Sequence, residues 1–276
     1  MQDNYQPIGV FDSGYGGLTI LKSIVDKLPA YDYIYLGDNA RTPYGSRSFD
    51  VVYQYTREAV MKLFSMGCQL VILACNTASA KALRTIQQND LPHIDPSRRV
   101  LGVIRPSVEK VPFYTKNGHV GVLGTSGTVL SNSYLLEIAK ISGDQIIVTQ
   151  EACPMWVPLV ENDETSNPAA DYFVRKNICN LFGRDPEIDT VILGCTHYPL
   201  LLPSIAKFLP DNVTLIQQGP LVAESLLDYL TRHPEMNLRC SKNGSRRYLT
   251  TESVQNFEPR ASMFLGRALK AEKIQL

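Results

Sequence analysis

The chain has 276 residues, of which 44% are hydrophobic and 20% charged, and its 27 basic and 27 acidic side chains cancel to a formal net charge of +0. A chain of this size can fold around its own core without disulfides. The balanced charge argues against a nucleic acid or an anionic membrane as the main partner, and the longest apolar runs are too short to cross a bilayer.

Eight short apolar runs, rich in β-branched residues, predict eight buried strands. In chain order these are 8–11, 33–36, 70–74, 100–103, 120–123, 146–149, 190–193 and 213–216. Their hydrophobic residues are nearly continuous rather than alternating, which is typical of parallel strands covered on both faces. Amphipathic stretches such as 18–28, 48–64 and 135–138 lie between them and predict helices. This alternation predicts an α/β protein with parallel sheets.

A weak internal repeat predicts two similar halves. Residues 71–77 (VILACNT) align with 191–197 (VILGCTH), and residues 8–14 align with 120–126 in the same order. We therefore expect two α/β domains related by a pseudo-twofold axis, with the active site in the cleft between them. Turn-forming residues place the first domain at 1–98 plus 213–276 and the second at 99–212.

The chain has six cysteines, and no two of them have the C-x-x-C spacing of zinc ribbons or thioredoxin-like motifs. The N-terminal residues Met1–Asn4 do not begin a signal peptide, so we expect a cytoplasmic protein with reduced thiols. Four of the cysteines are expected to be small packing residues: Cys68, Cys153, Cys179 and Cys240.

The other two cysteines, Cys75 and Cys195, occupy matching positions at the end of an apolar strand and before a helix. Ligands of open α/β sheets bind at the carboxyl ends of strands, and a helix N-terminus binds anions and lowers the pKa of a thiol. If the two halves close over one cleft, these thiols face each other across one small molecule. Racemisation needs such a pair, because one group removes a proton from one face of a carbon and the other returns a proton to the opposite face.

Polar residues near the thiols are candidates for the same site. Asp12 lies in the glycine-rich loop 11–17, and we interpret it as a partner of a thiol, with a structural turn residue as the alternative. This loop lacks both the dinucleotide-binding glycine spacing and the P-loop lysine, which excludes the nucleotide interpretations. His197 follows Cys195 by two residues and is predicted to be its proton partner.

Together these motifs resemble glutamate racemases, which are cofactor-independent enzymes of the aspartate/glutamate racemase family. The matching stretches recur in the family's order and are 10–19, 37–38, 43–45, 74–79, 124–128, 158–161 and 194–201. The resemblance implies racemisation of L-glutamate to D-glutamate for peptidoglycan synthesis. It also implies that neither pyridoxal phosphate nor a metal is needed, and that the protein is a homodimer.

The resemblance also implies roles for individual residues. Cys75 and Cys195 would be the two proton donors and acceptors, Asp12 would support Cys75, His197 would support Cys195, and Glu161 would lie at the cleft. The residues implied to contact glutamate are Asp12, Ser13, Tyr44, Gly45, Asn76, Thr77, Thr125, Thr128, Thr196 and His197.

Two stretches depart from the family pattern. Gln217-Gln218-Gly219 stands where Asp-Ser-Gly is common, and Arg105-Pro106-Ser107 stands where Glu-Pro-Gly is more usual. Neither touches a cysteine motif, but both leave the local interdomain geometry open. Three other functions also remain open at this point: an aspartate or hydantoin racemase on the same scaffold, a non-catalytic two-domain binder of small anions, and a cysteine hydrolase.

Overall fold

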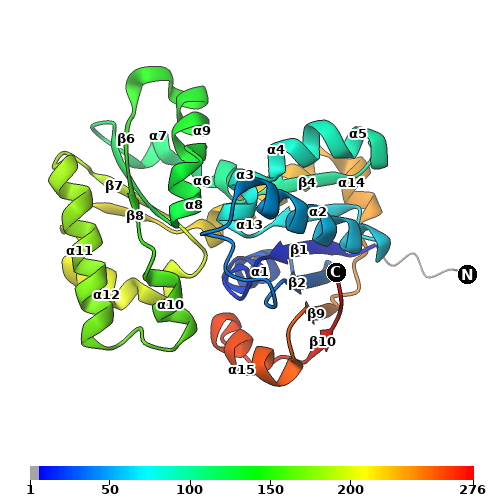
Figure 1. Cartoon of the computed structure of the whole chain (residues 1–276). Helices are drawn as coiled ribbons and strands as arrows, with labels where there is room; N and C mark the ends of the chain where they lie inside the picture. Colours follow the sequence, from blue (N-terminus) through cyan, green and yellow to red (C-terminus); the bar gives the residue numbers. More distant parts are fainter. Residues whose placement is uncertain (1–5) are drawn as a thin grey trace, which may run out of the picture.

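The computed structural model describes residues 6–276 as two parallel β-sheets flanked by helices (Figure 1). The predicted α/β fold with parallel sheets is confirmed. The N-terminal stretch Met1–Asn4, on which the expectation about a signal peptide rests, lies outside the described residues. Among residues 6–276, every helix is too short or too polar to pass through a lipid bilayer.

The first sheet has the strand order β10-β9-β2-β1-β3-β4 and the second has the order β6-β5-β7-β8. The eight strands expected from the sequence are present. The strand bounds are β1 Ile8–Asp12, β2 Tyr33–Gly37, β3 Leu70–Leu73, β4 Arg99–Gly102, β5 His119–Gly124, β6 Ile147–Ala152, β7 Thr190–Gly194, β8 Thr214–Ile216, β9 Arg246–Thr250 and β10 Ala271–Lys273. β9 and β10 were not expected, because two arginines open the first and the second is a three-residue Ala-Glu-Lys segment.

Helices connect the strands, and several begin at a capping side chain. Ser48, Thr125, Asn167 and Ser253 each accept a hydrogen bond from a backbone N–H three residues further on. The helix bounds are α1 Gly17–Lys27, α2 Phe49–Ser65, α3 Asn76–Lys81, α4 Leu83–Thr85, α5 Leu91–Ile94, α6 Ile104–Val108, α7 Val111–Tyr114, α8 Ser126–Leu130, α9 Ser133–Ser142, α10 Trp156–Glu161, α11 Pro168–Arg184, α12 Leu202–Phe208, α13 Gln218–Arg232, α14 Pro234–Arg239 and α15 Val254–Leu265.

The first sheet is buried on both faces, which explains the continuous apolar runs. Along β1, Ile8 and Val10 join a core that includes α1, α13 and α15, whereas Phe11 joins a core built with α2. Because successive side chains of a strand point to opposite faces, both sets must be apolar. The second sheet divides in the same way, with Val122 and Leu123 in different cores.

The two sheets share one connectivity. In β2-β1-β3-β4 and in β6-β5-β7-β8 the first strand of each set lies between the second and the third. The aligned sequence repeats contain the matching strands β1 and β5, and β3 and β7. Adjacent connections diverge at such a switch point and leave room for a ligand beyond the strand ends. The cysteine turns follow β3 and β7, so each half brings one thiol to its switch point.

The chain crosses between the sheets later than the sequence indicated. β4 pairs with β3 in the first sheet, although residues 99–102 were expected in the second domain. β8 pairs with β7 in the second sheet, although residues 214–216 were expected in the first domain. A short apolar run with turn residues before it predicts a strand but not the sheet it joins. Each half therefore keeps a fourth strand, and the crossings follow Gly102 and Ile216.

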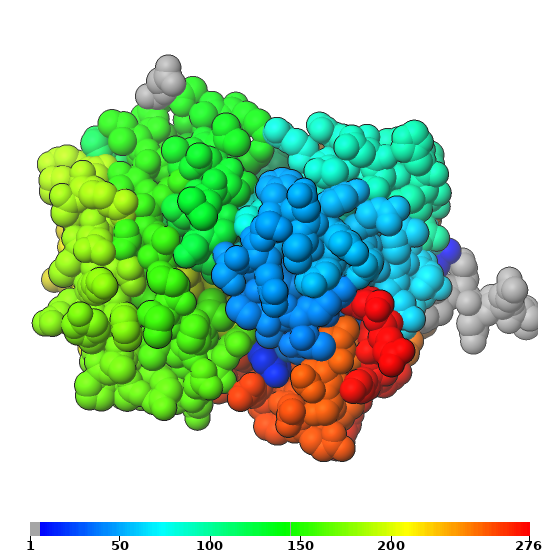
Figure 2. Space-filling view, in the orientation of Figure 1, coloured from blue at the N-terminus to red at the C-terminus, as the bar shows by residue number. Residues whose placement is uncertain are grey.

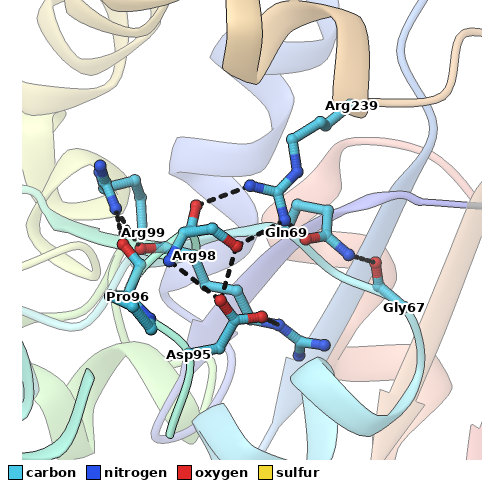
Figure 3. Close-up of polar contacts among 8 residues, drawn as sticks. Gly67, Gln69, Asp95, Pro96, Arg98, Arg99 and Arg239 are labelled. Atoms are coloured by element: carbon cyan, nitrogen blue, oxygen red, sulfur yellow. Dashed lines mark hydrogen bonds and ion pairs between the residues drawn. The ribbon is translucent and has the colours of Figure 1, made fainter. Parts of the chain in front are cut away.

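The turn at Asp95–Ser97, just before the domain boundary expected at residue 98, is an internal turn fixed by arginines (Figure 3). Asp95 accepts hydrogen bonds from the backbone N–H of Ser97 at 2.9 Å and from Nε of Arg98 at 3.1 Å. Arg239, at the end of α14, donates to the carbonyl of Ser97 at 2.8 Å. The turn thus attaches α14 to the start of the edge strand β4.

Candidate active site

A cavity of about 370 Å³ lies between the two halves and is lined by residues from both. The lining contains twelve of the thirteen residues predicted for the site: Asp12, Ser13, Tyr44, Gly45, Cys75, Asn76, Thr77, Thr125, Glu161, Cys195, Thr196 and His197. Thr128 is the exception. It is fully buried, and its hydroxyl lies 3.0 Å from that of Thr125, which does reach the cavity.

The sequence reasoning missed part of the wall. These residues are Thr42, Pro43, Ser46, Ser126, Cys153, Pro154, Val157, Pro158 and Asn162. Most flank a motif that was recognised, and 153–158 follow the end of β6, the strand beside β5. Chain proximity to the motifs was the available signal, since Cys153 and Pro154 carry no chemical pattern of their own. Cys153, which was expected to pack but also to lie close to the cleft because it precedes Glu161 by eight residues, lines the cavity.

Cys75 caps the N-terminus of α3. Its Sγ accepts a hydrogen bond from the backbone N–H of Ala78 at 3.4 Å and lies 3.3 Å from the hydroxyl of Ser13. Burial of the thiol, together with the negative charge of Asp12, raises the pKa of Cys75 to about 12, although both hydrogen bonds act in the opposite direction. The N–H group at the helix terminus lowers the pKa of this thiol, as predicted, but desolvation outweighs it, so the expected net decrease is wrong.

Asp12 is the last residue of β1 and is 1% exposed. Its Oδ2 accepts a hydrogen bond from the backbone N–H of Gly14 at 3.0 Å. Burial raises the pKa of Asp12, while the positive charge of His197 opposes the change. The carboxyl group of Asp12 therefore interacts electrostatically both with Cys75 and with His197 of the other half.

Cys195 follows β7 and belongs to a chain of contacts with His197 and Glu161. Its Sγ lies 3.8 Å from Nδ1 of His197, and Nε2 of His197 lies 2.9 Å from Oε1 of Glu161 at the end of α10. Burial disfavours the charged imidazolium, but the hydrogen bonds to Cys195 and Glu161 outweigh it and raise the pKa of His197 to about 10. The ring also packs edge-on against Phe264 of α15. Glu161 therefore acts on the Cys195 thiol through His197.

The glycine-rich loop 11–17 packs against the Cys195 turn. A Cβ atom at Gly16 would lie 2.3 Å from Oγ1 of Thr196 and 2.4 Å from Nδ1 of His197. The hydroxyl of Thr19 donates to the carbonyl of Thr196 at 3.0 Å. The sequence predicted that this loop allows a close backbone approach to a ligand. At Gly16 the close approach is to the Cys195 turn of the other half.

Two residues predicted to contact the substrate use their side chains in hydrogen bonds to other parts of the protein. The Tyr44 hydroxyl donates to the buried carboxylate of Asp38, and the Asn76 amide donates to Oε1 of Gln218 at 2.6 Å. What these residues can offer a ligand is mainly backbone. The hydroxyls of Thr77 and Thr125 lie 3.0 Å apart and join the two halves beside the cavity.

The loop that carries Tyr44 and Gly45 lies over the boundary between the halves, and Figure 2 shows this part of the chain (blue) against the second half (green). A Cβ atom at Gly127 of α8 would lie 2.6 Å from the carbonyl oxygen of Gly45. Asp38 anchors the loop, since its Oδ2 accepts a hydrogen bond from Nε of Arg41 at 2.6 Å. The loop thus closes one side of the cavity.

Comparison with known proteins agrees with this geometry. A family model described as Asp/Glu/Hydantoin racemase matches residues 8–226. The chain is 38% identical over 266 residues to a glutamate racemase from Geobacter metallireducens, covering 96% of this chain and 94% of that protein. The structure resembles a glutamate racemase crystal structure from Bacillus anthracis, with a TM-score of 0.89, 35% identity and coverage of 99% and 98%. It also resembles one from Francisella tularensis in complex with D-glutamate, with a TM-score of 0.87, 34% identity and coverage of 99% and 98%.

Proposed function

The chain belongs to the Asp/Glu/Hydantoin racemase family, and we infer that it is a glutamate racemase, an isomerase that interconverts L-glutamate and D-glutamate. The resemblance to glutamate racemases found in the motifs is confirmed. The observation that carries the inference is the single cavity into which two matching turns, one from each half, bring Cys75 and Cys195. We propose that the D-glutamate it makes supplies peptidoglycan synthesis, and that the protein works as a cytoplasmic homodimer.

The mechanism that we propose uses both thiols. One cysteine, as thiolate, takes the α-proton from one face of glutamate, and the Cα–H electron pair remains on the substrate as a carbanion. The other cysteine, as thiol, gives its proton to the opposite face, which forms the new Cα–H bond and leaves that sulfur as thiolate. The two cysteines exchange roles when the reaction runs in the other direction.

The two sides of the cavity support this exchange differently. His197 can give a proton to Sγ of Cys195 or take it back, and Glu161 holds the imidazole in place. Cys75, with a pKa of about 12, is protonated at neutral pH and is suited to donate. We propose that the negative charge of Asp12 helps to keep the Cys75 thiol protonated.

Hydroxyl and backbone N–H groups are suited to hold the substrate carboxylates. None of the described residues that line the cavity is lysine or arginine. The hydroxyls of Ser13, Thr77, Thr125 and Thr196 are among the side-chain donors there. A small dianion held by such local donors does not require a basic protein, in agreement with the net charge of +0.

The test is to follow purified protein with L-glutamate by circular dichroism and, in D2O, by proton NMR of the α-position. We expect loss of optical activity together with deuterium at the α-carbon of the product. Binding of glutamate with neither signal would support the small-anion binder. Faster turnover of aspartate or a hydantoin than of glutamate would move the assignment to a sister racemase. A covalent acyl-enzyme detected by mass spectrometry would support the hydrolase.

A further inference from the structure

One buried side chain connects the two places where the chain passes between the sheets. Val103 directly follows β4 at the first crossing, and Gln218 opens α13 just after β8 at the second. Nε2 of Gln218 donates to the carbonyl oxygen of Val103 at 3.0 Å. The two crossing segments, 115 residues apart in the sequence, are therefore hydrogen-bonded to each other where the chain passes between the sheets.

The same amide also contacts both halves of the molecule. Its Oε1 accepts from Nδ2 of Asn76 at 2.6 Å, and its Nε2 lies 3.0 Å from the hydroxyl of Tyr134 in α9 of the second half. The Tyr134 hydroxyl donates to Oδ1 of Asn76 at 2.9 Å. Gln218, Asn76 and Tyr134 are 3%, 2% and 0% exposed, respectively, so these hydrogen bonds form without competition from bulk water.

Asn76 is the residue that follows Cys75. The side-chain amide of Asn76 is hydrogen-bonded to Gln218 and Tyr134. The turn that presents the Cys75 thiol is therefore connected both to the crossing segments and to the second half. Proton delivery across the cavity depends on sub-ångström placement of the donor sulfur. We propose that Gln218 is a positioning residue, which holds the Cys75 turn against the second half so that Cys75 can protonate the carbanion. This rests on the two-thiol mechanism proposed above.

The two stretches that depart from the family pattern meet at this point. Nε2 of Gln218 lies 3.3 Å from the hydroxyl of Ser107, which is itself fully buried. A serine at position 218 is too short to span from Asn76 to Val103, and a glycine at 107 offers no hydroxyl.

The experiment compares Gln218→Met with Gln217→Met in the full-length protein. Methionine has nearly the length and volume of glutamine but lacks the amide, so the substitution removes the hydrogen bonds with little change in packing. Gln217 is the preceding residue, is exposed, and its side chain makes no capping bond to α13 in the described structure, so its replacement is the matched control. Each variant is incubated in D2O with pure L-glutamate and, separately, with pure D-glutamate, and inversion and deuterium in the recovered substrate are both measured.

We expect Gln218→Met to lower kcat by about 10-fold to 100-fold. With the enantiomer that Cys195 deprotonates, protonation of the carbanion by Cys75 becomes slower. Cys195 then protonates the carbanion more often, so the ratio of substrate exchange to inversion rises. With the other enantiomer the return step uses Cys75, so the same ratio falls below the wild-type value. The Gln217→Met variant should match the wild type in both measurements.

A proportional loss of exchange and inversion from both enantiomers, or an unchanged kcat, would show that Gln218 only packs and would overturn the proposal. Should Gln218→Met fail to fold, Tyr134→Phe removes one hydroxyl of the same network and must show the same one-sided rise. Failure of the two-thiol mechanism has a separate signature, because Cys75→Ala would then still racemise glutamate.

Discussion

Oε1 of Glu161 lies 2.9 Å from Nε2 of His197, and this contact makes the two thiol environments chemically unequal. The imidazole, hydrogen-bonded to a carboxylate, faces Cys195, whereas the hydrogen-bond partners of Cys75 are a hydroxyl and a backbone N–H. The two halves share a strand order, but their turns have different proton partners. A symmetric reaction is thus supported by an asymmetric site, and each side responds differently to pH and to substitution.

The first prediction concerns Glu161→Gln and pH. The pKa of His197 is raised from 6.5 to about 10, so the stability that its folded-state protonation contributes is fully present below pH 6.5 and is lost as the pH rises through 10. Removing the charge of Glu161 lowers this pKa. Thermal melting between pH 6 and pH 10 should therefore show a weaker loss of stability with rising pH in Glu161→Gln than in the wild type. Parallel melting profiles would contradict this role of Glu161.

The second prediction concerns the two thiols. Cys75→Ala and Cys195→Ala should each abolish racemisation, because one face of the α-carbon loses its proton carrier; a loss of at least about 100-fold is expected for removal of a general acid or base. Racemisation is measured by circular dichroism from both enantiomers. Cys179→Ala, which changes an exposed cysteine, is the control and should keep wild-type turnover. Full activity in either site variant would rule out the two-thiol mechanism.

Most of the strands and of the residues that line the cavity were predictable from the sequence, because both are marked by short sequence patterns. Continuous apolar runs require burial on two faces, and the repeated cysteine turns stand out against them. The same local signals could not assign β4 and β8 to their sheets, since which edge a strand joins depends on its neighbours in space.

Electrostatics and long-range contacts account for the other differences. The pKa of Cys75 depends on how deeply the thiol is buried and on the distance of Asp12, neither of which a sequence pattern records. Asn76 was correctly placed at the cavity, but the commitment of its amide to Gln218 involves a residue 142 positions away. Thr128 matched the motif, yet it lies one layer behind Thr125.

The third prediction concerns Asp12→Asn and the reactivity of Cys75. The carboxylate of Asp12 adds to burial in raising the pKa of the Cys75 thiol, so its removal should lower that pKa and increase the thiolate fraction. The rate at which iodoacetamide alkylates Cys75 between pH 7 and 9, read by mass spectrometry of the peptide, should be higher in Asp12→Asn than in the wild type. Exposed Cys179 in the same samples provides the internal reference. A slower alkylation of Cys75 in the variant would mean that Asp12 favours the thiolate.

The fourth prediction compares two glycines. In Gly16→Ala the new methyl group would overlap Oγ1 of Thr196 and Nδ1 of His197, at 2.3 and 2.4 Å, so the loop or the Cys195 turn must move. Because such a shift displaces the proton partner of Cys195, we expect kcat to fall by about 10-fold or more. In Gly183→Ala, within α11, the methyl group meets nothing within 4 Å, and the helix gains about 0.5–1 kcal/mol of stability.

The two alanine variants separate a catalytic effect from a structural one. Gly183→Ala should keep wild-type kcat and melt slightly higher. For Gly16→Ala the pH profile of kcat is decisive, because a displaced His197 loses its hydrogen bonds to Cys195 and Glu161 and its pKa falls. The limb of the profile that depends on protonated His197 should then move to lower pH. A lower kcat with an unmoved profile would mean that Gly16→Ala acts through the loop alone and leaves His197 in place.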